Sequence, residues 1–498
     1  MRRRASMLAI AVAVAAVAVV GFMTITGGGT SAAPTRSTTV GASTGETEGK
    51  GGSSEAAEEA ALTQERLDAW RAAKAAGRLR VHTAAAAAPA AGWAGQQVIS
   101  PTADDWEPAI AADPHSSYVY LLATRYTGPT ACGNQCPLPY HVLRVSSDGG
   151  ATWGPDRFLC ACRGANGQFD PEIEVVPNTG AVYAAWLNNG FNTVFSKSTD
   201  HGQTWTAPVT VYGNVAWTDK PVLAMSDNGN DVYIAFNGPT GGDPWIAQSH
   251  DAGATWTQTK IVDSKRYIYA FDGDVLPNGT VVFSMTSLLY GGGGALTGDD
   301  QVFVYRSQNG GASWSTIPVA TVQIGPVCTS AGCPADYYPG HSAISGFDNL
   351  HLVILYDGAS VSGGNETIYS KTSADGGMTW STPPVALSTA GEMGDFPAVE
   401  MASATDVRAW YMQTSGGNFD AWNTWYRSST TAGSSWTAPV KISDAAAGAA
   451  PYVTANGFLE PYGDYGEIAV TNTGKTIATW GEGTSYNGPG GVWVNRQT

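Results

Sequence analysis

The chain has 498 residues, enough for one large domain or a few small ones, and only 14% of them are charged. The formal net charge is −16, so the surface would repel a phosphate backbone and we expect no nucleic-acid partner. Glycine is frequent (61 residues), as is tryptophan (17 residues), which indicates many turns and a β-rich fold.

The N-terminus has the features of an export signal. Arg2, Arg3 and Arg4 precede an apolar run from Met7 to Met23, which matches the basic and apolar regions of such signals. The run is near the lower length limit for crossing a bilayer, so residues 1–30 are either a cleaved signal peptide or a single N-terminal anchor. Both alternatives place the rest of the chain outside the cytoplasm, secreted or extracellular. We expect a monomer that meets a membrane only through this segment.

Residues 31–92 are predicted to form a low-complexity linker that contains one helix. Most of this stretch is rich in Gly, Ser, Thr and Ala and offers few apolar residues for packing. Over about residues 54–80, acidic residues come first and Arg78 and Arg80 come last, an order that matches the dipole of a helix. We interpret this helix as a spacer or as a pro-segment that lies on the domain.

The six cysteines occur in three close pairs. The pairs are Cys132 with Cys136, Cys160 with Cys162, and Cys328 with Cys333. An even count in an exported chain favours disulfides, and this spacing is unusual for a four-cysteine zinc site, which is the alternative. Because Cys160 and Cys162 would point to one face of a strand, we expect them to bridge to the first pair, while the last pair closes a small loop.

From residue 93 onward one motif recurs six times, with the consensus Ser-x-Asp-x-Gly-x-Thr-Trp. Its tryptophans recur every 51–66 residues, a period that suits one four-stranded propeller blade per repeat. The third side chain would close a tight turn, the glycine would take a positive φ, and the tryptophan would pack between sheets. The third position, to which we assign a structural role, is occupied by Asp148, Asp200, Asp251, Asn309, Asp375 and Thr431.

Seven segments have the position of an innermost blade strand, one more than the number of motifs. Several begin with an acidic residue and proline, as in Glu107-Pro108 and Asp170-Pro171. The last unit ends without an outer strand, whereas residues 96–100 resemble the outer strand at 207–211. We therefore predict that residues 93–498 form an all-β propeller of seven blades, with six blades as the alternative. The N-terminal strand would complete the last blade and close the ring, which removes exposed sheet edges.

The repeats resemble the Asp-box (BNR) repeats of the sialidase superfamily, and the resemblance covers about residues 93–498. Residues 463–470 are also similar to a segment of bacterial sialidase-like proteins. The resemblance implies a propeller in which an arginine triad binds the substrate carboxylate, an Asp acts as acid and base, and a Tyr activated by a Glu is the nucleophile.

The arginine features of that family are not matched here. The Phe-Arg-Ile-Pro segment is absent, and residues 106–110 read Trp-Glu-Pro-Ala-Ile in its place. Three arginines stand just before a repeated motif: Arg144, Arg306 and Arg427. The same repeat position carries Lys197 elsewhere, which favours a structural role for all of them.

In a propeller, the loops that lead into the innermost strands form the usual ligand mouth, on the rim opposite the repeated turns. These loops are acidic and aromatic here, and clustered carboxylates shift one another's pKa, as acid/base chemistry requires. The residues predicted for catalysis are Asp170, Asp219, Tyr465 and Glu467, with Tyr465 as the nucleophile and Glu467 as its base in a sialidase-type mechanism. Those predicted for substrate binding are Glu107, Lys220, Arg266, Tyr267, His341, Asp395 and Asp464. The alternative role for the acidic residues beside prolines is to cap a turn at the start of a strand.

The expected function is that of an extracellular, glycan-active hydrolase, either an exo-sialidase or another glycoside hydrolase, whose partner is a carbohydrate or glycoconjugate. The alternative is a non-catalytic propeller that binds a glycan, a peptide or a cell-envelope partner. We expect no cofactor and no metal. Asp272-Gly273-Asp274 is compatible with calcium binding, but a turn is the favoured interpretation of this segment.

Overall fold

The computed structural model describes residue 75 and residues 88–498, with gaps in the second range. The gaps are 128–136, 160–166, 189–191, 216–217, 239–242, 262–265, 289–297, 326–339, 417, 444–452, 455–456, 459–465 and 484–489. The predicted signal or anchor, nearly all of the linker and its helix, all six cysteines, Asp464 and Tyr465 lie outside the described residues. Within the described residues, no helix is long and apolar enough to cross a membrane.

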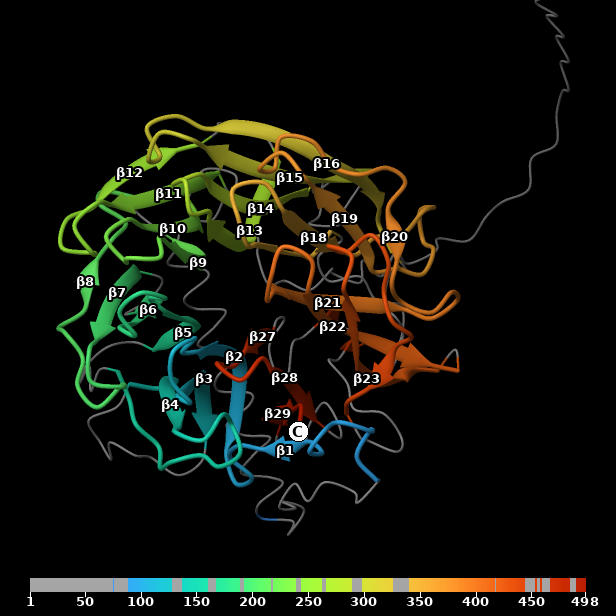
Figure 1. The fold of residues 1–498 in the computed structure, drawn as a ribbon, viewed down its shortest axis with the longest axis horizontal. Coiled ribbons are helices and arrows are strands. Elements are labelled where there is room, and N and C mark those ends of the chain that lie inside the picture. Colours follow the sequence, from blue (N-terminus) through green and yellow to red (C-terminus); the bar gives the residue numbers. More distant parts are fainter. Residues whose placement is uncertain are drawn as a thin grey trace, which may run out of the picture. The chain divides into compact units, whose positions relative to one another are not determined.

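The described strands form seven antiparallel sheets around a common axis, and we number these blades in chain order (Figure 1). Blade 1 consists of β2 (Asp104–Ala112), β3 (Val119–Thr127) and β4 (Tyr140–Ser146). Blade 2 consists of β5 (Gln168–Val175), β6 (Val182–Asn188), β7 (Asn192–Ser198) and β8 (Val209–Thr210). Blade 3 consists of β9 (Asp219–Met225), β10 (Val232–Asn237), β11 (Pro244–Ser249) and β12 (Thr257–Lys260). Blade 4 consists of β13 (Tyr267–Val275), β14 (Val281–Leu288), β15 (Asp299–Ser307) and β16 (Ser315–Gln323).

The remaining three blades have the same order, with the first strand innermost. Blade 5 consists of β17 (Ser342–Gly346), β18 (Leu352–Tyr356), β19 (Tyr369–Ser373) and β20 (Val385–Ala386). Blade 6 consists of β21 (Gly394–Met401), β22 (Val407–Ser415), β23 (Asn418–Ser429) and β24 (Val440–Lys441). Blade 7 consists of β27 (Glu467–Val470), β28 (Thr476–Gly483), β29 (Gly490–Arg496) and β1 (Gln97–Val98). The short strands β25 (Val453–Thr454) and β26 (Gly457–Phe458) pair with each other only.

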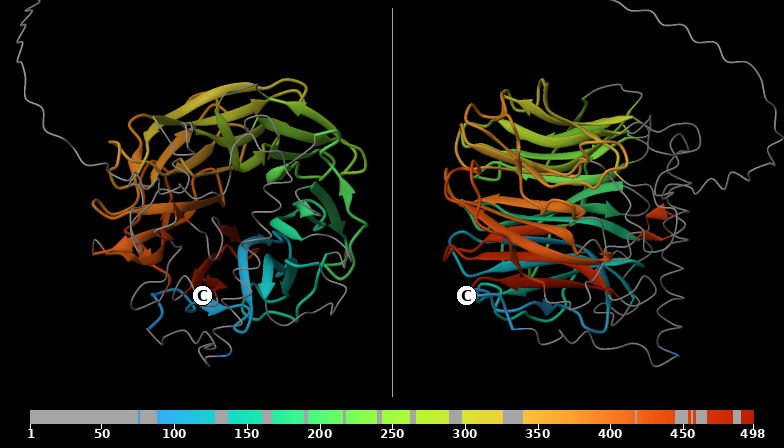
Figure 2. Two further views of the ribbon diagram at one scale, coloured as in Figure 1. Left: turned by 180° about the vertical axis from the view of Figure 1, so that it is seen from behind. Right: turned by 90° about the vertical axis from the view of Figure 1, so that its right-hand side faces the viewer.

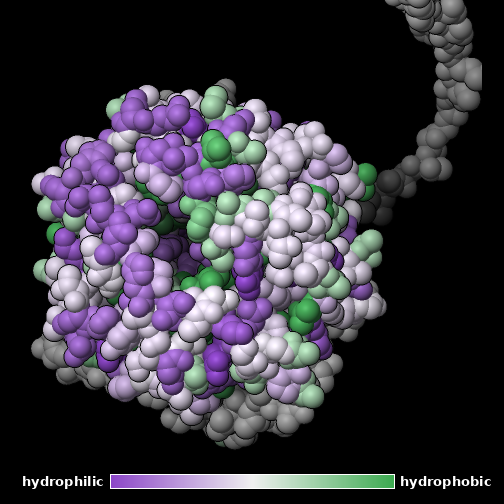
Figure 3. All heavy atoms as spheres, viewed as in Figure 1, coloured by the Kyte–Doolittle hydropathy of each residue, from purple (hydrophilic) through white to green (hydrophobic). Residues whose placement is uncertain are grey.

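The N-terminal strand closes the ring, as predicted. β1 pairs with β29 in antiparallel register, and Val98 lies opposite Trp493. Seven blades are therefore confirmed, and the alternative of six is wrong. In blade 1 the fourth strand is reduced to an isolated bridge between Leu143 and Arg157. Figure 2 shows the ring from behind and from the side, with the strands running roughly along its axis, and Figure 3 shows a hollow at the centre of one face.

Apolar side chains between neighbouring blades form a series of cores. Phe195 of blade 2 packs with Leu223 and Ile234 of blade 3 in one of these clusters. The middle strands have a blade on each side and are therefore buried on both faces. This explains continuous apolar runs such as β18, whose five residues Leu352–Tyr356 are all buried. The sheets thus stand radially, and each depends on its two neighbours for its burial.

The repeated motif forms the same turn in each copy. In blade 2, Asp200 Oδ1 accepts the backbone N–H of Thr204 (2.8 Å), Asp200 Oδ2 accepts its hydroxyl (2.6 Å), and the Ser198 hydroxyl accepts the N–H of Gly202 (2.9 Å). The hydrogen bonds from Thr204 lower the pKa of Asp200 to about 2. The equivalent residues that accept the same N–H are Asp148, Asp251, Asn309, Asp375 and Thr431. At all six positions the side chain acts as a hydrogen-bond acceptor that closes the turn. These turns lie on the rim opposite the predicted ligand mouth.

Each turn also touches the preceding blade. The motif glycines have φ between +71° and +83°, as predicted. A Cβ atom at Gly253 would lie 2.2 Å from the ring of Phe195 in the preceding blade, so only glycine fits there. Trp256, which ends the same motif, packs against the core between blades 2 and 3. The prediction that the tryptophan lies between sheets is confirmed.

Basic side chains near the turns tie blades together. Lys197 of blade 2 donates to the carbonyl of Ala252 in the turn of blade 3 (2.8 Å), and Arg306 of blade 4 donates to Gly376 in the turn of blade 5 (2.6 Å). Arg144 donates to Gly154 in its own blade (2.8 Å), and Arg427 donates to the hydroxyl of Tyr411 (3.3 Å). The three arginines thus lie on three blades and have structural partners.

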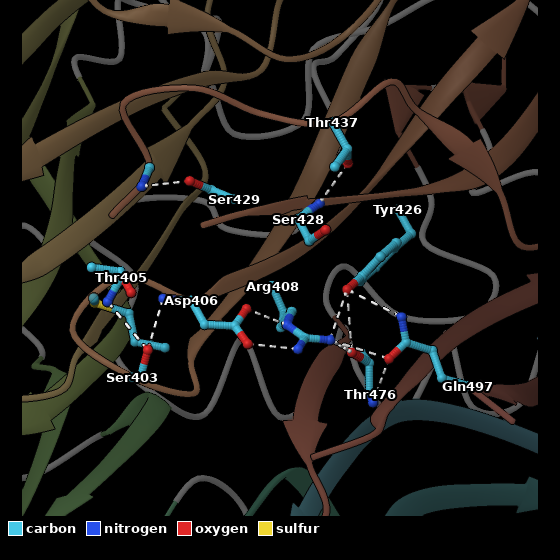
Figure 4. A network of polar contacts seen from close by, with 12 residues as sticks. Ser403, Thr405, Asp406, Arg408, Tyr426, Ser428, Ser429, Thr437, Thr476 and Gln497 are labelled. Carbon is cyan, nitrogen blue, oxygen red and sulfur yellow. Dashed lines mark hydrogen bonds and ion pairs between the residues drawn. The ribbon is translucent and has the colours of Figure 1, made fainter. Parts of the chain in front are cut away.

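A polar network joins blade 6 to the closing blade (Figure 4). Asp406 accepts two hydrogen bonds from the Arg408 guanidinium, at 2.5 and 2.6 Å. The remaining nitrogen, Nη1, donates to Thr476 of β28 and to Gln497 after β29, both at 3.1 Å. Tyr426 shares these partners, since its hydroxyl lies 3.3 Å from Gln497 Nε2. The network holds the C-terminal strands against blade 6.

Replacing Gly253 with alanine should lower the free energy of unfolding by about 2–4 kcal/mol, because the new Cβ both meets Phe195 and strains the left-handed backbone. The matched control is Gly279→Ala. Gly279 has φ +79°, but nothing lies within 4 Å of its Cβ position, so backbone strain alone should cost about 1–2 kcal/mol. Urea unfolding of both variants measures the difference. If both variants lose the same free energy of unfolding, the contact between residue 253 and Phe195 of the preceding blade does not contribute to the effect.

Candidate functional site

Four inner strands carry the same strained bulge near the rim opposite the repeated turns. Glu107, Asp170, Lys220 and Phe396 have φ values of 44–53°, and each precedes a proline. Strand pairing is interrupted around each of them. A non-glycine residue with positive φ costs free energy, so the surrounding structure must enforce this shape. The acid-proline segments predicted as possible turn caps are therefore bulges within strands.

The predicted mouth residues are mostly buried rather than lining an open surface. The buried ones are Glu107, Asp170, Asp219, Tyr267, His341 and Asp395. Glu107 accepts a hydrogen bond from the Thr124 hydroxyl (3.1 Å). The two predicted cations, Lys220 and Arg266, are partly buried, and Arg266 donates to the Ser287 hydroxyl (2.6 Å). Within the described residues, these two side chains and the arginines beside the turns do not form a converging arginine triad.

A buried arginine that the sequence did not single out lies on this rim in blade 1. The Arg125 side chain is fully buried and bonds to Asp105 at 2.7 Å, Asp156 at 2.6 Å and Ser100 at 2.7 Å. Asp105 is 2% exposed. These contacts join the inner strand of blade 1 to the segment after β1 and so bridge the ring closure.

Acidic side chains of the inner strands face the axis of the ring. They are Glu172, Glu174, Asp272, Asp274, Glu400 and Glu467, from β5, β13, β21 and β27. Carboxylates from blades 2, 4, 6 and 7 contribute to raising the pKa values of Glu172, Glu174 and Glu467, so these groups lie within electrostatic range of one another in the space that the inner strands surround. All six are at least partly accessible to solvent, in agreement with the hollow in Figure 3. We call this space the axial channel.

The channel carboxylates cap the free edges of neighbouring strands. Glu467 Oε2 accepts the backbone N–H of Ile110 in blade 1 at 2.5 Å. Asp272 and Asp274 of blade 4 accept the N–H groups of Ile344 and Gly346 in blade 5, at 2.8 and 2.7 Å. The inner strand of a blade has no pairing partner on its channel side, so these bonds satisfy donors that would otherwise lack a partner in the protein.

Burial and mutual repulsion keep several of these carboxyls protonated. The enclosing protein raises the pKa of Asp272 and of Glu400 to about 8 and that of Asp274 to about 6. It also raises the pKa of Glu467 well above its ordinary value, and the charge of Glu172 adds to the effect. Water reaches the channel, but protein surrounds it on all sides, so charge there is poorly screened. At neutral pH the channel contains both protonated and ionised carboxyls.

A second cluster lies where blades 4, 5 and 6 meet. His341, just before β17, Asp357, just after β18, and Asp395 of β21 each place a donor atom within 4.8 Å of the others. All three are buried, at 4%, 0% and 2% exposure. The His341 ring lies 4.4 Å from the ring of Phe271 and 5.3 Å from that of Phe396, measured between centroids. The strands thus bring together two residues predicted for the site and one that was not predicted.

Several members of both clusters were not predicted as site residues. Glu174, Asp274 and Glu400 follow the alternation of inner strands, and this period of two could have placed them on one face. Asp357 had no comparable signal, since it only follows an apolar strand. The turn favoured for residues 272–274 is wrong, because they lie within β13. Asp170 and Asp219 lie on inner strands as predicted, but both are buried.

The fold and the channel define a seven-bladed β-propeller with acidic inner strands. No family model matches the chain. It is 25% identical over 199 residues to a xyloglucanase from a Paenibacillus species. That match covers 37% of this chain and 17% of the xyloglucanase, so the chain spans less than a fifth of that relative's length.

Three solved structures illustrate the fold-level likeness. An ulvan lyase of polysaccharide lyase family PL25 is 12% identical, with 81% of this chain and 95% of that chain covered and a TM-score of 0.47. The NanB sialidase from Streptococcus pneumoniae is 11% identical, with 80% and 69% covered and a TM-score of 0.42. A Dyadobacter fermentans protein of unknown function is 16% identical, with 68% and 98% covered and a TM-score of 0.42.

The protein should lose stability as the pH rises from about 4 to about 8. The pKa values of Asp272 and Glu400 are raised to about 8, so over this range the folded state binds more protons than the unfolded state. Glu400→Gln removes one such group. We expect this variant to exceed the wild type in stability by about 1–3 kcal/mol at pH 8 and to match it near pH 4.

Thermal unfolding midpoints at the two pH values provide the measurement. Asp375→Asn is the control, because hydrogen bonds within its turn lower the pKa of Asp375 despite an opposing effect of burial. That variant should gain nothing at pH 8. If the Glu400→Gln variant is as stable as the wild type at both pH values, the pKa of Glu400 is not raised in the folded protein.

Proposed function

We propose that this protein is a carbohydrate-active propeller that hydrolyses glycosidic bonds outside the cytoplasm, with residues 1–30 serving as its export signal or anchor. The observation that carries the proposal is the pairing of Glu172 and Glu467 in the axial channel. The charge of Glu172 raises the pKa of Glu467. Each of the two also accepts a backbone N–H from a neighbouring strand, Glu172 from Leu223 and Glu467 from Ile110. Glycoside hydrolysis commonly uses a pair of carboxyl groups of this kind, one of which donates a proton.

The chemistry needs one protonated and one ionised carboxyl. When two such groups interact strongly, one retains its proton after the other has lost it. We assign Glu467 as the proton donor to the leaving oxygen and Glu172 as its ionised partner. Asp170 precedes Glu172 on β5 and lies nearer the rim at which that strand starts, so we assign it to substrate positioning. In a sialidase-type mechanism, which is the alternative to this assignment, Tyr465 would be the nucleophile and Glu467 its base.

The partial sequence match bears on which class of substrate the protein would cleave. The matched relative is a xyloglucanase, which supports a glycan in preference to a peptide. The described cations do not support a sialoside in particular, because Arg266 and the arginines beside the turns already have protein partners. We therefore expect a neutral glycan to be cleaved faster than a sialoside.

One observation favours the alternative of a non-catalytic glycan-binding propeller. Asp170 and Asp219 are 8% and 4% exposed, so two of the residues predicted for catalysis have little access to a substrate. In that case the channel carboxylates would only cap strand edges, and glycans would bind without being cleaved.

A panel of glycans tests the proposal, including xyloglucan, ulvan and a sialoside. The wild type should release reducing ends from at least one of them, with a bell-shaped dependence on pH. Glu467→Gln should lower kcat about 100-fold or more, because an amide keeps the bond to the Ile110 N–H but has no proton to donate. Glu172→Gln should have a comparable effect.

The control variant is Asp375→Asn, which removes a carboxylate from a repeated turn on the opposite rim and should leave kcat within about twofold of the wild type. Binding of a glycan without cleavage would establish the non-catalytic alternative. Unchanged turnover in both glutamine variants would reject the assigned residues.

A further inference from the structure

We propose that His341, Asp357 and Asp395 form a binding site for a single divalent cation of the Zn²⁺ or Mn²⁺ type. The three residues lie on or directly beside three different strands, yet their donor atoms are all within 4.8 Å of one another. His341 Nδ1 and Asp395 Oδ1 are 3.6 Å apart. This is too long for a hydrogen bond but close to the spacing of two ligands that share one ion at about 2.1 Å from each.

The histidine supplies an independent indication. His341 is 4% exposed, and its Nδ1 atom is buried without a hydrogen-bond partner in the structure. A buried imidazole nitrogen normally has a partner, because losing its bond to water costs free energy. The rings of Phe271 and Phe396 pack near the imidazole and offer it no acceptor. A cation at this point would complete the coordination of Nδ1.

The carboxylates are held in place by the backbone. Asp357 Oδ1 accepts the N–H of Gly340 at 2.7 Å, and Asp395 Oδ1 accepts the N–H of Phe396 at 2.6 Å. The strained backbone at Phe396 thus fixes one ligand. Hydrogen bonds of this kind orient ligands before the ion arrives and contribute to metal affinity.

The donor set selects the class of ion. One imidazole nitrogen with two carboxylate oxygens suits Zn²⁺ and Mn²⁺, whereas Ca²⁺ takes six to eight oxygen ligands and has little affinity for imidazole. Three protein ligands leave at least one coordination position for water or a further ligand. The inference does not depend on the proposed glycosidase function, because the ion would bind whether or not a glycan is cleaved.

Titration of the chelator-treated full-length protein with Zn²⁺, and separately with Mn²⁺, tests the site by calorimetry. The wild type should bind one metal ion per chain at these three residues. Its thermal unfolding midpoint should rise as the site becomes saturated. His341→Ala should weaken this binding about 100-fold, and Asp395→Asn at least 10-fold. Ca²⁺ should bind more weakly than either ion.

His351→Ala is the matched control. His351 is also in blade 5, but it pairs with Asp348 at 2.8 Å on the surface and should not affect the ion. If His341→Ala fails to fold, as judged by circular dichroism, Asp357→Asn and Asp395→Asn decide the matter, since asparagine keeps the acceptor for the backbone N–H. The proposal is overturned if the wild type takes up neither ion. It is also overturned if the variants at His341, Asp357 and Asp395 bind the ion as tightly as the wild type. That result would place the ion elsewhere, for example at the cysteines.

Discussion

The free inner edge of each blade is the constraint on which the centre of this molecule depends. A radial sheet pairs its first strand on one side only, and the unpaired N–H groups face the axis. At the junctions described, a side chain of one blade accepts these donors from the next, as Glu467, Asp272 and Ser345 do for Ile110, Ile344 and Met401. Most of these acceptors are carboxyls, so satisfying the backbone also concentrates acid in the channel.

This crowding explains why the channel has unusual proton chemistry. Glu467, Asp272 and Asp274 are stabilised by backbone donors, but enclosure and the negative charge of neighbouring groups destabilise their ionised forms. The balance favours the protonated form for Asp272 and Glu400. A structural need at the strand edges thus produces acids with pKa values near neutrality, and the proposed hydrolase would use two of them. The histidine cluster is a separate feature, because its carboxylates bond to the backbone of their own blades and not to the next blade.

The fold could be predicted from the sequence because its determinants are local and repeated. Each motif specifies its own turn through contacts such as that between Asp200 and Thr204, and six copies fix the period. The closing pair of β1 and β29 followed from counting strands. The site was predicted less well because it depends on which side chains converge across blades. His341 and Asp395 stood out by residue type, whereas Asp357 gains its meaning only from the packing of β18 beside them.

The pairing of β1 with β29 also determines how the ring responds to a pull on its two ends. The strands are antiparallel, Gln97 lies opposite Val494, and the bridge of Trp93 to Gln497 comes closest to both ends of the folded chain. A force applied there would open the hydrogen bonds one after another, as a zipper opens, instead of shearing them all at once. The seam that completes the ring would therefore open by unzipping under such a pull, and the Arg408 network that holds Thr476 and Gln497 lies beside it.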